Sequence, residues 1–164
     1  MIKLRQATLN DLAVIIHLDQ GIFGAYGADE EPGIIRSRLE VFPEGCVVLI
    51  ETQENDSILG YLTTEKWASL REPMLDENPY ETPNPLGTVL NITTLAIAPT
   101  YQNRQLGKRL LDYAVEIARR ENCIQIVLET ARAQRFYLRH NFTIISERQQ
   151  RGIHLTVMGL DVAT

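Results

Sequence analysis

The fold of this chain is most constrained by an apolar strand that runs through a short polar turn into an amphipathic helix. The strand covers residues 88–98, and the helix begins near Arg104 with apolar side chains at helical spacing on one face. This order directs several main-chain N–H groups and the positive end of the helix dipole toward the turn. The junction therefore predicts an anion site suited to phosphate, with a plain strand–turn–helix connection as the alternative interpretation.

The same junction resembles the acetyl-CoA signature of the GCN5-related N-acetyltransferases, the GNAT family. In that family an apolar strand precedes the motif Q/R-x-x-G-x-G/A and a helix. Gln102 and Gly107 fit the motif, whereas Gln105 stands where its first glycine is expected. Because the donors are main-chain groups, we expect Gln105 to supply its N–H from ordinary helix-start geometry.

A second stretch, residues 133–142, is similar to the family's other cofactor motif, A-x-x-F-Y-x-x-x-G-F. Asn141 takes the place of the glycine, and asparagine tolerates positive φ better than most residues. Thr130 stands where the family often has asparagine. Helical spacing predicts that Phe136 packs inward and that Tyr137 faces elsewhere. The resemblance implies that the Tyr137 hydroxyl lies near the sulfur of acetyl-CoA.

Apolar periodicity and turn residues predict the element order β-α-α-β-β-β-α-β-α-β-β. Strands are expected at residues 2–5, 46–51, 58–66, 88–98, 124–129, 142–149 and 152–160, and helices at 11–20, 31–40, 104–121 and 131–140. Gly21, Gly24 and Gly27 should break the first helix, and Pro32 should lie in the first turn of the second. This order is that of the GNAT fold, an α/β (α+β) fold with a mixed, mostly antiparallel central sheet flanked by helices. We expect one N-acetyltransferase domain over residues 1–164.

Composition narrows the classes of protein that this chain can be. With 45% apolar and 23% charged residues it has the balance of a globular protein, and no apolar run approaches the ~20 residues of a membrane span. The N-terminus lacks the apolar stretch of a signal peptide, so we expect a cytoplasmic protein with no membrane partner. A net charge of −5 argues against nucleic acid as the main partner. Cys46 and Cys123 are expected to be reduced and buried, and the three histidines show no metal-ligand spacing.

The resemblance implies an acetyl-CoA-dependent N-acetyltransferase that acts on a primary amine, with no metal. The main chain of Leu95, Ala96 and Ile97 would pair with the pantetheine arm and supply the donor for the oxyanion. The other cofactor-binding residues would be Gln102, Asn103, Arg104, Gln105, Leu106, Gly107, Lys108 and Thr130, with Arg109 adding positive charge nearby. Tyr137 is the candidate acid for the departing thiolate.

The general base stays unassigned at this point. Asn91, Thr93 and Thr94 lie on the strand beside the reacting groups, but none is a competent base. Glu129 ends a central strand near the expected site but can also pair with an arginine, and Glu65 can face the acceptor from the neighbouring strand; a structural role is favoured for each.

The amine acceptor is also open: a small amine, an amino-acid derivative, an antibiotic, or a protein N-terminus or lysine. The long segment 67–87 holds four prolines and is expected to cover the acceptor side. Its aromatic and acidic residues, together with residues 29–31, would suit a cationic amine: Trp67, Glu72, Asp76, Glu77, Tyr80 and Glu81. Simple solvation would explain the acidic residues equally well, and a homodimer contact would explain the length and aromatic residues of the segment.

Two other functions compete with catalysis. A catalytically degenerate acyl-CoA-binding or regulatory domain is favoured by Gln105 and the missing base, and opposed by Tyr137. A nucleotide-binding phosphate loop would need G-x-x-x-x-G-K-[S/T], which the chain lacks.

Overall fold

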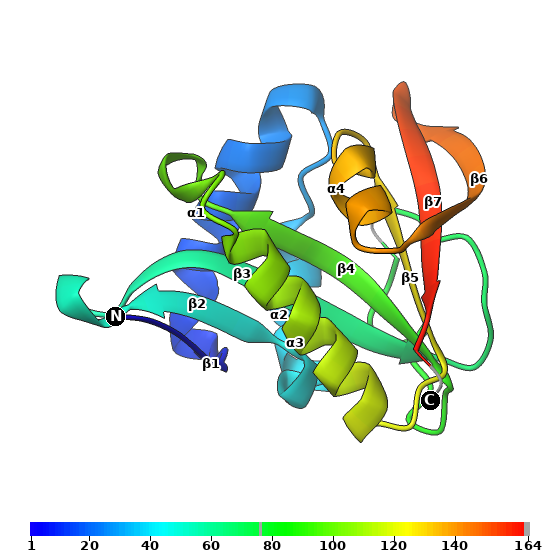
Figure 1. Cartoon of the computed structure of the whole chain (residues 1–164), viewed down its shortest axis with the longest axis horizontal. Helices are drawn as coiled ribbons and strands as arrows, with labels where there is room; N and C mark the ends of the chain where they lie inside the picture. Colours follow the sequence, from blue (N-terminus) through cyan, green and yellow to red (C-terminus); the bar gives the residue numbers. More distant parts are fainter. Residues whose placement is uncertain (76, 163–164) are drawn as a thin grey trace.

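A seven-stranded sheet runs through the molecule in the order β1-β2-β3-β4-β5-β7-β6 (Figure 1). The computed structural model describes residues 1–75 and 77–162. The strands are β1 (Ile2–Gln6), β2 (Val47–Glu51), β3 (Ser57–Trp67), β4 (Val89–Ile97), β5 (Gln125–Thr130), β6 (Thr143–Gln150) and β7 (Ile153–Asp161). The helices are α1 (Leu12–Phe23), α2 (Pro32–Val41), α3 (Leu106–Arg120) and α4 (Gln134–Arg139). The predicted order of elements is confirmed.

Every neighbouring pair of strands is antiparallel except β4 and β5, which are parallel. The connection between these two strands contains α3, because parallel strands need a crossover rather than a hairpin. The expected mixed, mostly antiparallel sheet is therefore confirmed.

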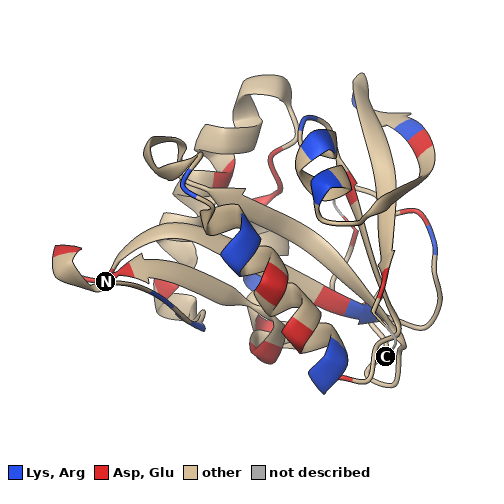
Figure 2. Cartoon of the chain, in the orientation of Figure 1, with Lys and Arg blue, Asp and Glu red and all other residues tan. Residues whose placement is uncertain are grey.

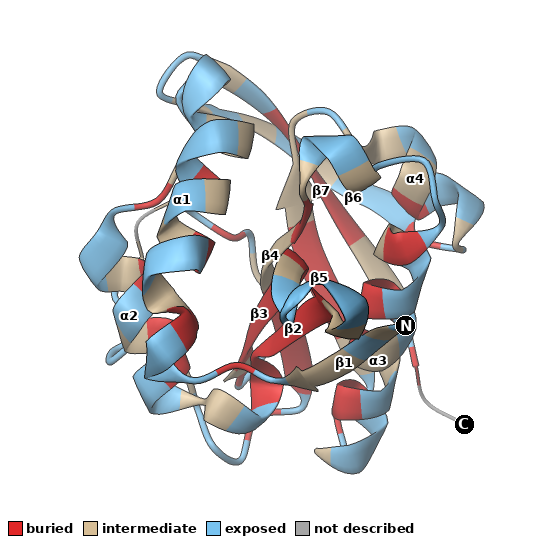
Figure 3. Cartoon of the chain, turned by 90° about the vertical axis from the view of Figure 1, so that its left-hand side faces the viewer, coloured by how far each residue is buried: buried red, intermediate tan, exposed pale blue. Residues whose placement is uncertain are grey.

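Helices cover both faces of the sheet and divide the core in two. The larger apolar cluster joins α3 and α4 to the sheet and includes Leu90, Leu110, Ile117 and Phe142. A second cluster joins α1 and α2 to the opposite face through Ile15, Ile35, Leu39, Val48 and Tyr61. Figure 3 shows the buried residues concentrated on the strands, while the outward sides of α1 and α2 are exposed. In Figure 2 the outward side of α3 carries both signs of charge.

The boundaries of α1 differ from the prediction. Gly21 does not break the helix, which continues to Phe23; a 3₁₀ turn follows, and Gly27 ends it at φ +82°. Glycine inside a helix costs about 1 kcal/mol relative to alanine but does not forbid the helix. Pro32 begins α2 as predicted, because its missing N–H is one that a helix start leaves unpaired anyway.

Several local predictions are confirmed at turns and at the cysteines. Asn141 has φ +73°, and the last hairpin turns through Arg151 and Gly152, which both have positive φ as a type I′ turn requires. Cys46 and Cys123 are free and buried. Among the described residues, no helix is both long enough and apolar enough to cross a bilayer.

The sheet splits between β4 and β5. These strands pair only from Val89 to Asn91, opposite Gln125 to Val127, and beyond that point β5 pairs only with β7 on its other side. A bulge at Thr93 shifts the register of β4 against β3, since Thr63 pairs with Thr94 and Thr64 with Ile92. A bulge bends a strand and increases its twist, which is consistent with the divergence of β4 from β5.

Candidate active site

A cavity of about 1070 Å³ occupies the split between β4 and β5. Its walls come from the diverging part of β4, the end of β5, the starts of α3 and α4, the α1–α2 region and the loop after β3. The residues expected at the site and found in its lining are Leu95, Ala96, Ile97, Gln102, Asn103, Gln105, Leu106, Gly107, Lys108, Thr130 and Tyr137. The fold thus brings residues from two separate sequence motifs to one cavity.

The edge of β4 that faces β5 is one wall of the cavity. Beyond Asn91, no strand in the described part of the chain pairs with this edge. Its main-chain donors and acceptors near Leu95, Ala96 and Ile97 can therefore pair with an extended ligand as an added strand would. On the far side of β4, Gly60 lies so close that a Cβ there would come within 2.6 Å of the Ala96 carbonyl oxygen.

The start of α3 is a second wall, and here one prediction is wrong. Gln105 precedes the helix with φ +60° and ψ +18°, a left-handed conformation, so α3 begins at Leu106 rather than near Arg104. The loop thus takes a conformation that glycine adopts without steric cost and that a side chain makes unfavourable. Within the described part of the chain, no side chain caps this helix start, and the first N–H groups of any helix lack intrahelical partners.

Gly107 and two aromatic residues connect α3 to α4. A Cβ on Gly107 would lie 3.3 Å from the Phe136 ring, so glycine allows this close approach. Tyr137 is 6% exposed and packs edge-on against Phe136 and Phe142, with ring centroids 5.0 and 5.3 Å away. Phe136 is partly buried and packs against the core as predicted, whereas the predicted orientation of Tyr137 is wrong, because Tyr137 is itself a core residue. Burial raises the pKa of Tyr137.

The basic residues expected around the phosphates are arranged differently from the prediction. Arg104 does not line the cavity; its guanidinium lies over the Tyr101 ring, 5.1 Å from the centroid. Arg109 also lies outside the lining and donates to the main-chain oxygen of Ile2 at 3.2 Å. Lys108 does line the cavity and pairs with Asp112 at 2.7 Å.

Two polar side chains of the lining are engaged in local hydrogen bonds. Gln102 Nε2 donates to the Ile97 carbonyl at 3.1 Å, which fixes the turn after β4. Thr130 Oγ1 accepts the N–H of Ala133 at 2.9 Å and so stabilises the segment that leads into α4.

The two carboxylates considered as bases are both paired. Glu129 faces the cavity and accepts two hydrogen bonds from Arg148, each 2.7 Å long, while burial raises its pKa. Glu65 lies outside the lining and accepts from Trp67 Nε1 at 2.6 Å and from Thr82 Oγ1 at 2.9 Å. Both therefore have structural partners.

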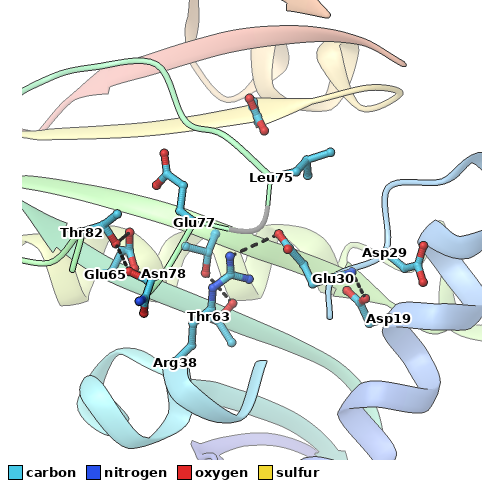
Figure 4. A network of polar contacts seen from close by, with 12 residues as sticks. Asp19, Asp29, Glu30, Arg38, Thr63, Glu65, Leu75, Glu77, Asn78 and Thr82 are labelled. Atoms are coloured by element: carbon cyan, nitrogen blue, oxygen red, sulfur yellow. Dashed lines mark hydrogen bonds and ion pairs between the residues drawn. The ribbon is translucent and has the colours of Figure 1, made fainter. Parts of the chain in front are cut away.

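The α1–α2 end of the cavity holds a buried charged cluster (Figure 4). Asp19 accepts the Tyr61 hydroxyl at 2.9 Å and the Glu30 N–H at 2.8 Å, and Arg38 Nη2 lies 3.2 Å from Glu30 Oε1. Burial raises the pKa of both carboxyl groups. Asp19 and Arg38 are not among the predicted site residues, although each occupies the buried face of its helix: Arg38 follows Ile35 by three residues.

The segment after β3 reaches the cavity through Pro73, Met74, Leu75 and Glu77. Gln150 on β6 holds it, because its side chain accepts the Leu75 N–H at 3.0 Å and donates to the Leu75 carbonyl at 3.3 Å.

Trp67 and Tyr80 do not supply the expected contact area at the cavity. Trp67 is buried against Val89, Val127 and Val157, and Tyr80 is exposed and donates its hydroxyl to Glu40 at 2.7 Å. Of the acidic loop residues, Glu30 and Glu77 line the cavity, and Glu72 and Glu81 do not. Asp76 lies outside the described residues.

Comparisons with known proteins agree with this geometry. A family model described as "Acetyltransferase (GNAT) family" matches residues 12–142, and no curated protein matches the chain. The loading GNATL domain of CurA from Lyngbya majuscula is similar in structure, with a TM-score of 0.85, 18% identity, and coverage of 99% of this chain and 98% of that one. The GphF GNAT-like decarboxylase in complex with isobutyryl-CoA has a TM-score of 0.82, 18% identity, and coverage of 98% and 100%. The yncA protein from Salmonella typhimurium with acetyl-CoA has a TM-score of 0.70, 18% identity, and coverage of 100% and 95%.

Proposed function

Because the chain belongs to the acetyltransferase (GNAT) family, we propose that it transfers an acetyl group from acetyl-CoA to a primary amine. The proposal rests mainly on one observation: the free edge of β4, the uncapped start of α3 and Tyr137 meet at a single cavity. The edge would hold the pantetheine arm and the start of α3 would hold the pyrophosphate.

In the reaction, the neutral amine nitrogen attacks the thioester carbonyl carbon. A C–N bond forms, the C–S bond breaks, and the amine releases one proton to solvent, from which the tyrosine that protonates the sulfur regains its own. A main-chain N–H near Leu95–Ile97 would stabilise the oxyanion, and Tyr137 would give its proton to the departing sulfur. The Tyr137 hydroxyl is protonated at neutral pH, and its burial, which raises its pKa, makes it a weaker acid toward the thiolate than an exposed tyrosine would be.

The alternative is acyl-CoA binding without transfer. It is favoured by the pairing of the cavity carboxylates, since Glu129 is held by Arg148 and Glu30 by Arg38. Gln105 in the motif's glycine position favours it as well.

The two functions are separated by incubating the protein with acetyl-CoA and a panel of primary amines. Free CoA thiol and acetylated amine are then both measured, the amine by mass spectrometry. A transferase produces them in equal amounts. Thiol without acetylated amine, or binding of acetyl-CoA with no turnover of any amine, would support the alternative. The product measurement is needed because hydrolysis of the thioester also releases free thiol.

A further inference from the structure

Arg38 brings unpaired hydrogen-bond donors to the α1–α2 end of the cavity, where we expect the substrate amine to bind. Its side chain is 5% exposed and lines the cavity, and it donates a hydrogen bond to Glu30 through Nη2 only. Nε and Nη1 have no hydrogen-bond partner among the described residues. A buried cationic donor without an acceptor lowers the free energy of unfolding. We therefore expect an oxygen of a ligand or of a solvent molecule to accept hydrogen bonds from these two nitrogens.

Asn91 adds an unpaired acceptor to the same cavity. It lies on β4 where the split from β5 begins, is 3% exposed, and its Oδ1 has no partner in the described part of the chain. Asn91 and Arg38 thus offer complementary groups, one acceptor oxygen and two donor nitrogens, to the same cavity. Figure 4 shows the Arg38 guanidinium reaching from α2 toward Glu30, beside Thr63 of β3 and beneath Glu77 of the loop.

These groups restrict the chemistry of the acceptor. A protonated alkylamine or polyamine has only hydrogen-bond donors, so it cannot satisfy Arg38. An amine that also carries a carbonyl or carboxylate oxygen can satisfy Arg38 with the oxygen and Asn91 with an N–H. The Glu30 carboxylate neutralises part of the Arg38 charge, so a neutral amide oxygen is as suitable as an anionic one.

We propose that Arg38 forms an acceptor subsite, which binds the carbonyl or carboxylate oxygen of an amino-acid-type amine and orients its nitrogen toward the thioester. This inference rests on the proposed transferase function and specifies its substrate class. The oxygen can belong to a free amino acid or to a peptide-like amide, and these sources are distinguished by the test.

The test compares three small acceptors of similar size: glycine, glycinamide and n-propylamine, which lacks the oxygen. Each is acetylated by the wild type, by Arg38→Lys and by Arg36→Lys. Lysine at position 38 keeps a charge for Glu30 but removes Nε and Nη1. Arg36 is the matched control, because it lies on the same helix, is exposed and pairs with Glu40. Circular dichroism and acetyl-CoA affinity verify that each variant is folded.

We expect the wild type to prefer glycinamide or glycine over n-propylamine by ~10-fold or more in kcat/KM, as for loss of a charged hydrogen bond. Arg38→Lys should remove most of this preference through KM and leave n-propylamine within about twofold, whereas Arg36→Lys should change neither. Glycine against glycinamide then identifies the source of the oxygen. Equal kcat/KM for the three amines, or a preference that Arg38→Lys leaves intact, would overturn the inference. It would mean that water, rather than the substrate, accepts hydrogen bonds from Nε and Nη1.

If no amine is acetylated, the proposed function fails, and binding alone tests the subsite. Calorimetric titration of the CoA-loaded wild type should then show glycinamide or glycine binding that Arg38→Lys abolishes. Binding of n-propylamine with the same affinity, or no binding of the oxygen-bearing ligands, would refute it.

Discussion

Tyr137 is held by packing rather than by a network of polar groups. It lies between Phe136 and Phe142, lines the cavity, and has a raised pKa because it is buried. We predict that Tyr137→Phe lowers kcat by ~100-fold and leaves acetyl-CoA affinity nearly unchanged, since only the proton donor is lost. Tyr101→Phe is the control, because Tyr101 also lines the cavity but donates its hydroxyl to Glu54. Steady-state kinetics with equal turnover in both variants would exclude Tyr137 from the mechanism.

Gln105 carries a conformational cost at the start of α3. Its φ of +60° disfavours a side chain by about 1–2 kcal/mol, and the greater chain entropy of glycine in the unfolded state offsets part of any gain. We predict that Gln105→Gly stabilises the fold by about 1 kcal/mol, or a rise of about 2–4 °C in Tm, and preserves or tightens acetyl-CoA binding.

Asn103 provides the comparison for Gln105. It also has positive φ, at +64°, but asparagine tolerates this region better than glutamine does. Asn103→Gly should therefore raise Tm less than Gln105→Gly. Calorimetric scans in which Gln105→Gly lowers Tm would show that its side chain contributes more than its backbone costs.

At the scale of elements, α1 contains a glycine that lowers the stability of the helix. Gly21 lies inside the helix, and a Cβ there would meet none of the described atoms outside the adjacent helix backbone within 4 Å. We predict that Gly21→Ala stabilises the fold by about 0.5–1 kcal/mol, because alanine loses less backbone entropy than glycine on folding. Urea unfolding measures the change. No gain would mean that α1 is not continuous through residue 21.

The loop between β3 and β4 depends on one side chain of β6. Gln150 both accepts from and donates to the backbone of Leu75, and Arg148 donates to its Oε1 at 2.8 Å. We predict that Gln150→Ala raises the acceptor KM about tenfold and leaves acetyl-CoA affinity intact, because Leu75 lines the cavity. Gln150→Glu should have a smaller effect, since it keeps the oxygen that Leu75 and Arg148 share.

Gln149→Ala is the matched control for this loop, because Gln149 is the exposed neighbour on the same strand. Equal kinetics for Gln149→Ala and Gln150→Ala would mean that the loop does not shape the acceptor side.

Elements with strong periodicity were predictable, and those set by tertiary contacts were not. The apolar run of β4 and the apolar stripe of α3 identified the strand–turn–helix junction, because these patterns follow directly from local geometry. The left-handed Gln105 and the bulge at Thr93 have no such pattern, since each depends on how neighbouring elements pack. Arg38 was detectable as a charge on the buried face of α2, but its unpaired nitrogens are visible only in three dimensions.

At the scale of the whole molecule, buried carboxyl groups link stability to pH. Asp19, Glu30 and Glu129 all have raised pKa values because they are buried. Such groups bind protons more readily in the folded state than in the unfolded state. Their contribution to the free energy of unfolding is therefore greatest below an ordinary carboxyl pKa of about 4, and it is lost as pH rises through the raised pKa. Asp11 acts oppositely, since Arg5 lowers its pKa and its contribution is lost as pH falls.

We predict that, as pH rises above about 4, removing the carboxyl group in Asp19→Asn makes Tm relative to the wild type rise with pH, because the wild type loses the contribution of Asp19 over this range. The groups around Asp19 are the Tyr61 hydroxyl, the Glu30 N–H, Arg38 and Asp29. Asp112→Asn on the exposed side of α3 serves as the control. Calorimetric scans across this range that fall in parallel for wild type and Asp19→Asn would contradict the prediction.

The central claim is that acetyl-CoA binds in the split of the sheet, along β4 and at the start of α3. Titrating ¹⁵N-labelled protein with acetyl-CoA, while following its backbone amide resonances, tests this claim most directly. The account predicts saturable shifts for the amides of Leu95, Ala96, Ile97 and residues 105–108, which line the cavity. Resonances that stay unchanged at millimolar acetyl-CoA, or shifts confined to residues outside the cavity, would contradict it.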